Sequence, residues 1–153
     1  MNNDYISTEV RTILNTQKDN KYEAQALASA WILGNLKGIN LKILNVAGTS
    51  SLADYFILAS ATNTTQAKSM ADTLLKQFKI NGVEAISSEG LDDAQWILID
   101  LGDILVHIFQ ESSRTLYDLD HLFISAPRVD IPSSYYFSED AAAQAPEDSK
   151  SFF

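Results

Sequence analysis

The segment Glu89–Phe109, EGLDDAQWILIDLGDILVHIF, constrains the fold more than any other part of the chain. Two apolar runs flank Leu101-Gly102, and glycine readily takes the positive φ that a tight hairpin turn requires. The segment is therefore predicted to form a β-hairpin with Leu101-Gly102 as its two loop residues. Because successive side chains of a strand point to opposite faces, the composition of each face follows from this pairing.

The two faces of the predicted hairpin differ in composition. Ile99 is expected opposite Ile104, and Ile97 opposite Val106, so one face is β-branched throughout and is predicted to belong to the core. The other face mixes aromatic, imidazole, leucine and acidic side chains: Trp96 opposite His107, Leu98 opposite Leu105, Phe109 beyond them, and Asp100 beside Asp103 at the turn.

Two interpretations of the mixed face stay open at this point. Helices could cover both faces of the hairpin, which would make Trp96 and His107 an interior contact. Alternatively, this face is at least partly exposed, and a patch of tryptophan, leucine and histidine ringed by acids is typical of a protein-binding hot spot. Periodicity alone does not separate the two interpretations.

Catalytic or metal chemistry on the hairpin is disfavoured. Asp100, Asp103 and His107 are possible ligands for zinc or manganese, but the histidine lies roughly 13 Å along the strand from the turn. His121, the other histidine, has no evident partner. The chain also lacks a nucleophile elbow and the glycine motifs that bind phosphate. We expect no catalytic residues, no metal and no cofactor.

The rest of the chain alternates predicted strands and helices. This order indicates a single α/β domain with a mixed sheet of about five strands flanked by helices. The predicted elements outside the hairpin are a helix at Lys21–Leu36, strands at Leu41–Val46 and Asp54–Ser60, a helix capped by Asn63 and stopped by Asn81-Gly82, a strand at Val83–Ile86, and a helix from about Glu111 to before Ala126.

The predicted domain occupies residues 20–127. Residues 1–19 are interpreted as a polar N-terminal extension with a weak helical pattern, and residues 128–153 as a C-terminal tail that is disordered from about residue 138. The chain shows neither a secretory signal nor an apolar run long enough for a bilayer, and it has no cysteine. We therefore expect a cytoplasmic protein with no membrane association.

The charge balance bears on the kind of partner. With 11 Lys and Arg against 20 Asp and Glu, the net charge is −9. Proteins that hold nucleic acid do so by neutralising phosphates with basic side chains, so a direct grip on nucleic acid is disfavoured. A basic protein partner is favoured, because opposite surface potentials steer association.

Four stretches in order resemble one family: LKGINLKILNV, SSLADYFILASATNTTQ, the hairpin segment and YDLDHLF. Together they are similar to the ribosomal silencing factor, or Iojap, family over roughly residues 24–126. The pattern formed by Trp96, Asp100, Gly102, Asp103, Val106 and His107 is the most specific part. One departure is Asn45, where the family usually has aspartate. The resemblance implies a nucleotidyltransferase-like fold without the catalytic residues, and no enzymatic activity.

The resemblance also implies a function. Family members bind the large ribosomal subunit through its ribosomal protein fourteen and block joining of the small subunit, which represses translation; some form homodimers. A large-subunit assembly factor is an alternative, and a metal-dependent nucleotidyltransferase-like enzyme is a less favoured one. By the resemblance, Trp96 is the anchor in the partner protein, and the partner-binding residues are Trp96, Leu98, Asp100, Asp103, Leu105, His107, Tyr117 and Leu122.

Overall fold

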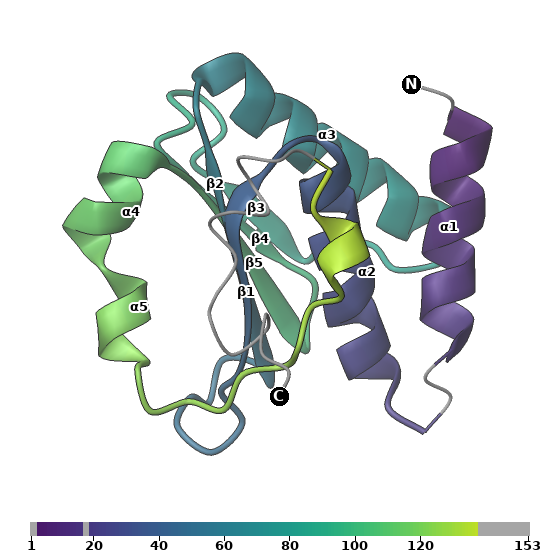
Figure 1. The fold of residues 1–153 in the computed structure, drawn as a ribbon, viewed down its shortest axis with the longest axis horizontal. Helices are drawn as coiled ribbons and strands as arrows, with labels where there is room; N and C mark the ends of the chain where they lie inside the picture. Colours follow the sequence, from purple (N-terminus) through teal and green to yellow (C-terminus); the bar gives the residue numbers. More distant parts are fainter. Residues whose placement is uncertain (1–2, 17–18, 138–153) are drawn as a thin grey trace.

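The computed structural model describes residues 3–16 and 19–137, and it shows a five-stranded sheet between helical layers (Figure 1). The α/β class and the five-stranded mixed sheet are as predicted. In chain order the elements are α1 (Asn3–Thr16), α2 (Lys21–Asn35), β1 (Ile39–Asn45), β2 (Tyr55–Ala61), α3 (Thr64–Ile80), β3 (Ser87–Glu89), β4 (Trp96–Asp100), β5 (Ile104–Gln110), α4 (Glu111–Tyr117), α5 (Leu119–Leu122) and the 3₁₀ turn η1 (Ser133–Tyr135).

The strands lie in the order β1-β2-β5-β4-β3. The central pair, β2 and β5, is parallel, and the other three pairs are antiparallel. Every residue of β2 is buried, as its continuous apolar run predicted, because a central strand is covered on both faces. The chain between β2 and β5 contains α3, the long connection that a parallel pair requires.

One face of the sheet packs against α2 and α3, and α1 lies outside α2 (Figure 1). This main core includes the β-branched face of the hairpin, where Ile97, Ile99 and Val106 have no exposed surface. The stretch interpreted as a polar extension contributes as well. Its helix α1 buries three side chains in the same core: Ile6, Val10 and Ile13.

The hairpin pairs two residues away from the predicted register. Leu98 lies opposite His107 and Trp96 opposite Phe109, so the predicted Trp96–His107 pairing is wrong. Gly102 takes the positive φ of 99° as the first of two loop residues, Gly102-Asp103, whereas Leu101 belongs to the buried end of the hairpin. A shift of two residues leaves every side chain on its predicted face, so the separation of the faces is correct.

The strand predicted at Val83–Ile86 is displaced to β3. Val83 instead closes the end of α3: its N–H donates to Phe78 O, and the N–H of Gly82 donates to Lys79 O. These two bonds form a Schellman cap, with Gly82 in the left-handed conformation. Val83 completes the cap, so contact with β4 begins further along: the N–H of Ile86 donates to Asp100 O at 2.8 Å, and the strand pairing runs from Ser87.

The last predicted helix is two short helices, α4 and α5. Asp118 separates them with a φ of 51°, in the left-handed region. Its carboxylate accepts a hydrogen bond of 3.3 Å from the N–H of His121, which caps α5. A cap at this position ends one helix and starts another, so the side chains on either side point differently from those of a continuous helix.

The chain after α5 returns along the outer edge of β1 (Figure 1). Asn45 N–H donates to Pro127 O at 2.7 Å, and Val129 N–H donates to Ile43 O at 2.9 Å. Tyr136 is buried against the main core. The stretch interpreted as a C-terminal tail thus packs against the domain as far as residue 137, and the disorder predicted from about residue 138 lies outside the described residues.

Close to this return, Gly34 of α2 lies directly beneath η1. A Cβ placed on Gly34 would come within 2.0 Å of Tyr135 O, so only glycine fits at this crossing. Of the helices in the described part of the chain, none is both long and apolar enough to cross a membrane.

Candidate functional site

The mixed face of the hairpin lies under α4 and α5, on the side of the sheet opposite α2 and α3 (Figure 1). It forms a second, smaller core. Both sequence interpretations hold in part, because some residues of this face are interior and others reach the surface. The buried members are Leu44, Val46, Ala53, Phe56, Leu58, Leu105, Phe109, Leu119 and Ala126, and the half-buried members are Trp96, Leu98 and Phe123.

His107 is an interior residue, with 4% of its surface exposed. Its Nδ1 accepts a hydrogen bond of 3.1 Å from the indole Nε1 of Trp96. Burial, and secondarily the positive charge of Arg114, lowers the pKa of His107 from 6.5 to about 4. The imidazole is therefore neutral at pH 7, and since Nδ1 is an acceptor, its proton resides on Nε2.

Trp96 links this interior to the surface. Its indole stacks on Phe109 with ring centroids 5.0 Å apart, and it makes a tilted contact with the ring of Tyr117 of α4, with centroids 4.8 Å apart and planes at 44°. Tyr117 is 52% exposed. The ring of Trp96 is thus held by a buried histidine and phenylalanine on its inner side, and by a surface tyrosine from the neighbouring helix.

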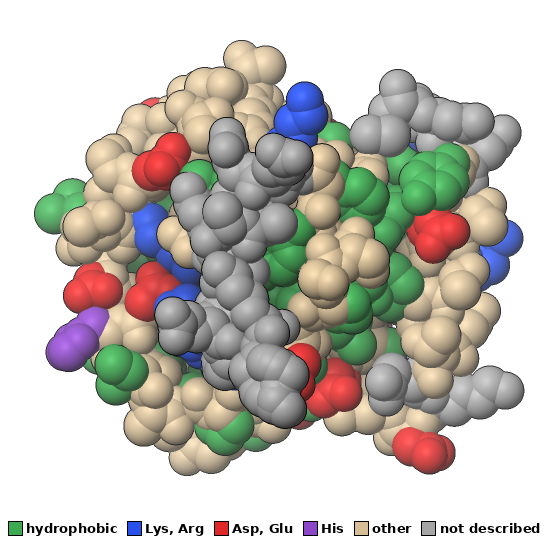
Figure 2. Space-filling view, in the orientation of Figure 1, with side chains coloured by type: hydrophobic (Ala, Val, Ile, Leu, Met, Phe, Trp, Pro, Cys, Tyr) green, Lys and Arg blue, Asp and Glu red, His purple; other side chains and the backbone are tan. Residues whose placement is uncertain are grey.

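Large apolar side chains project from α4, α5 and the turn after them. Leu122 is 70% exposed, as a docking role would require. Leu116 and Ile124 are also largely exposed, and the sequence analysis did not single them out. Figure 2 shows hydrophobic side chains standing out at the left margin, over α4 and α5, with acidic side chains between them. We call Trp96, Leu98, Tyr117 and Leu122 the candidate docking surface.

The two acids of the hairpin lie at its turn, away from Trp96. Asp100 ends β4, which Trp96 begins, so the two Cα atoms are separated by roughly 13 Å of strand. Asp100 Oδ1 accepts a hydrogen bond of 2.9 Å from the N–H of Gly102 and so stabilises the turn. Asp100 and Asp103 are both partly exposed. They lie at the turn, apart from the four residues of the candidate docking surface.

The eight predicted partner-binding residues divide by accessibility. Six have exposed surface, namely Trp96, Leu98, Asp100, Asp103, Tyr117 and Leu122. Leu105 and His107 are buried beneath the others, so they can support a docking surface but cannot contact a partner directly. Within residues 3–16 and 19–137, no three histidine or acidic side chains are grouped so that they could hold a metal ion.

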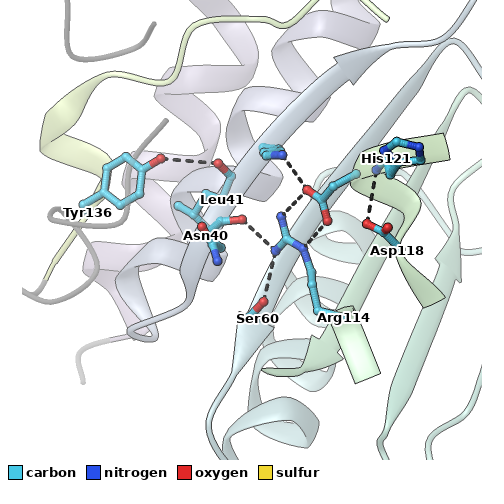
Figure 3. Close-up of polar contacts among 9 residues, drawn as sticks. Asn40, Leu41, Ser60, Arg114, Asp118, His121 and Tyr136 are labelled. Carbon is cyan, nitrogen blue, oxygen red and sulfur yellow. Dashed lines mark hydrogen bonds and ion pairs between the residues drawn. The ribbon is translucent and has the colours of Figure 1, made fainter. Parts of the chain in front are cut away.

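The sequence analysis missed the buried Arg114 of α4, which is 7% exposed. Its guanidinium donates to both carboxylate oxygens of Asp120 at 2.9 and 3.0 Å, to Asn40 O at 2.7 Å and to Ser60 Oγ at 3.0 Å. Figure 3 shows the guanidinium lying between α5 and the two strands that carry Asn40 and Ser60. The network therefore joins α4, α5, β1 and β2.

The carboxylate of Asp120 is held ionised in this network. Burial by itself raises the pKa of Asp120, but hydrogen bonds and charge attraction from Arg114 and Lys42 lower it well below the usual range. No sequence signal joined Arg114 to Asp120. Positions six apart lie on different sides of a continuous helix, and only the break at Asp118 brings them together.

Beside this network is an open hollow of about 310 Å³. It is lined by Asn40, Lys42, Arg114, Thr115, Asp118 and Asp120. Two basic and two acidic side chains border it, so it has no net charge preference. Arg114 and Lys42 already pair with Asp120, which leaves little of their charge for a ligand.

The comparisons with known proteins agree on one family. The family model described as "Ribosomal silencing factor during starvation" matches residues 17–152, a range that continues beyond the domain expected from the sequence. The ribosomal silencing factor of Bacillus subtilis is 36% identical over 88 residues, which are 58% of this chain and 75% of that protein.

This chain is also similar to a solved structure and to a more distant relative. The crystal structure of a Bacillus halodurans protein superposes with a TM-score of 0.61 at 31% identity, covering 73% of this chain and all of that one. A mouse protein named "Mitochondrial assembly of ribosomal large subunit protein 1" is 24% identical over 106 residues, 67% of this chain and 46% of that protein.

Proposed function

Because the chain belongs to the ribosomal silencing factor family, a family of ribosome-associated factors, we propose that it binds the large ribosomal subunit and sterically blocks joining of the small subunit. The proposed contact is ribosomal protein fourteen. The proposed recognition elements are the candidate docking surface, with Trp96 as its anchor, and the acids of the β4–β5 turn at its margin.

The ring contact between Tyr117 and Trp96 carries this proposal. Aromatic side chains that are half-buried, rigidly held and flanked by exposed leucine are the usual anchors of protein interfaces. The hydrogen bond to His107 and the stack on Phe109 fix the indole before any partner arrives. Less side-chain entropy is then lost on binding, which favours affinity.

The charge of the chain supports the choice of partner. A net charge of −9 opposes a grip on ribosomal RNA and favours a basic ribosomal protein. In this proposal Asp103, which is partly exposed, acts as a rim charge that steers encounter more than it adds affinity. The same negative field would repel the RNA of an approaching small subunit.

Two measurements on purified subunits test the proposal. The protein should co-sediment with large subunits and not with small subunits, and added protein should reduce the fraction of joined ribosomes in a sucrose gradient. Large subunits depleted of ribosomal protein fourteen should fail to bind the silencing-factor chain. Binding that survives this depletion would refute the proposed contact, and joining that is unaffected by bound protein would refute the block.

A role in large-subunit assembly is the second candidate, favoured by the name of the mouse relative. The same docking surface could serve either role. Cells lacking the protein separate the two: accumulated large-subunit precursors would support assembly, whereas mature subunits with excess joining would support silencing. A homodimer, implied by the resemblance, stays a prediction that light scattering of the purified chain can test.

A further inference from the structure

The position of the docking surface depends on two very short helices. α4 has seven residues and α5 has four, and isolated helices of this length do not hold their shape in water. Tyr117 lies at the end of α4 and Leu122 at the end of α5, on either side of the left-handed residue Asp118. Contacts with the sheet must therefore set the relative position of these two side chains.

Apolar contacts of α4–α5 leave some freedom of position. Leu119 and Ala126 are buried in the second core and Phe123 is half-buried there, but apolar packing is non-directional and tolerates sliding. Arg114, in contrast, constrains the orientation of the two helices. A planar guanidinium bound through both oxygens of one carboxylate fixes orientation as well as distance.

Arg114 also reaches the sheet on two strands. One nitrogen, Nη1, donates both to Asn40 O of β1 and to Ser60 Oγ of β2. Asn40 has a φ of 54° where the β1–β2 register shifts, and its carbonyl is the one that accepts the shorter bond from Arg114. Lys42 of β1 adds a second tie by pairing with Asp120. Among these ties, the Arg114 side chain alone bonds to both β1 and β2.

We propose that Arg114 is the positioning residue of the docking surface: through Asp120, Asn40 and Ser60 it fixes α4 and α5 on the sheet so that the ring of Tyr117 stays in contact with that of Trp96. The residue does not contact the partner. The inference rests on the proposed function for its binding consequence, while its effect on the Tyr117–Trp96 ring contact belongs to the free protein and can be measured without ribosomes.

The test compares Arg114→Met with Arg11→Met, the same substitution at an exposed site on α1, across the sheet. Nuclear Overhauser contacts between the rings of Tyr117 and Trp96 should disappear in Arg114→Met and persist in Arg11→Met. Contacts between Ile97 and Ile108 in the main core should persist in both variants. Affinity for large subunits should fall roughly tenfold or more in Arg114→Met, as expected when a preorganised surface is loosened.

Two milder variants cover the case in which Arg114→Met does not fold. Asp120→Asn keeps the shape of the carboxylate but offers only one acceptor oxygen, and Arg114→Lys keeps the charge but not the planar fork. Each should weaken the ring contacts and the binding together. Unchanged ring contacts, or unchanged affinity in a variant that has lost them, would overturn the inference. Failure of the unaltered protein to bind large subunits would instead refute the proposed function, and the ring contacts would still decide the positioning role.

Discussion

Nε1 of Trp96 donates a hydrogen bond of 3.1 Å to Nδ1 of His107, from the first residue of β4 to the interior of β5. The two residues are not a cross-strand pair, since His107 lies opposite Leu98. The bond is a diagonal one across the hairpin, and it sets the plane of the indole. A neutral histidine is required, because a protonated Nδ1 cannot accept.

Replacing Trp96 by alanine should greatly weaken binding to large subunits. If Trp96 is the anchor, the loss should be about 2 kcal/mol or more, as for other interface hot spots. Equilibrium binding by co-sedimentation measures it, with circular dichroism to show that the variant is folded. Tyr5→Ala is the control, because Tyr5 is an exposed aromatic of α1 on the other side of the sheet. Full binding by folded Trp96→Ala would remove Trp96 from the site.

Tyr117→Ala and Leu122→Ala should weaken binding with little effect on stability. Both side chains are more than half exposed, so their loss should change the free energy of unfolding by no more than about 0.5–1 kcal/mol. Ile80→Ala is matched to them, since Ile80 is an exposed apolar residue of α3 on the opposite face. Thermal melts and binding isotherms give both quantities; equal binding by all three variants would contradict the docking surface.

Stability should fall as the pH is lowered from about 6.5 to about 4, in part because of His107. The unfolded chain takes up a proton at the ordinary imidazole pKa of 6.5, whereas the folded protein resists protonation until about 4. The contribution is fully present above 6.5, is lost as the pH falls toward 4, and amounts to about 3 kcal/mol. Urea unfolding at several pH values measures the loss.

His107→Asn isolates this contribution from other titrating groups. Asparagine offers an acceptor oxygen near the position of Nδ1 but does not ionise. Between pH 7 and 4 the variant should therefore lose less stability than the unaltered protein, and above pH 7 it should keep the orientation of Trp96. Parallel pH profiles for the two proteins would show that His107 titrates normally.

Gly34→Ala should destabilise the protein by displacing the segment that returns along β1. The new methyl group would meet Tyr135 O, a backbone atom that cannot move alone, at a cost of about 1–3 kcal/mol. Gly48→Ala is the matched control, because a Cβ there meets no atom within 4 Å. Hydrogen exchange should show faster exchange at Val129, whose N–H bonds to Ile43 O, in Gly34→Ala only.

Local signals predicted much of the fold. The run of apolar residues in β2, the Asn63 cap of α3 and the Gly82 stop each have a short-range physical cause, and each was correct. The predicted register of the hairpin was wrong. A shift of two residues leaves both faces unchanged, so the pattern of apolar and polar residues cannot detect it. The two registers differ in the place of Gly102, which is the second loop residue in the predicted turn and the first in the observed one.

The site was less predictable than the fold. The alternation of side chains along the strands showed that Trp96 and His107 share a face. The burial of that face depends on α4 and α5, and the break between these helices at Asp118 gives no periodic signal in the sequence. The same break hides the Arg114–Asp120 pair, which joins residues on two helices to Asn40 and Ser60 far away in the chain. Contacts of this kind are set by tertiary packing, and no single-window pattern contains them.

The parallel pairing of β2 with β5 has a consequence for how the chain assembles. Tyr55 pairs with Ile104, and the strand that fills the centre of the sheet is the last of the five to be synthesised. Until β5 emerges, the β1–β2 pair and the β3–β4 pair have no shared neighbour, and β2 presents an unpaired apolar edge. A nascent chain shorter than about Gln110 therefore has no complete sheet, so the candidate docking surface and the core that supports it are completed together, late in synthesis.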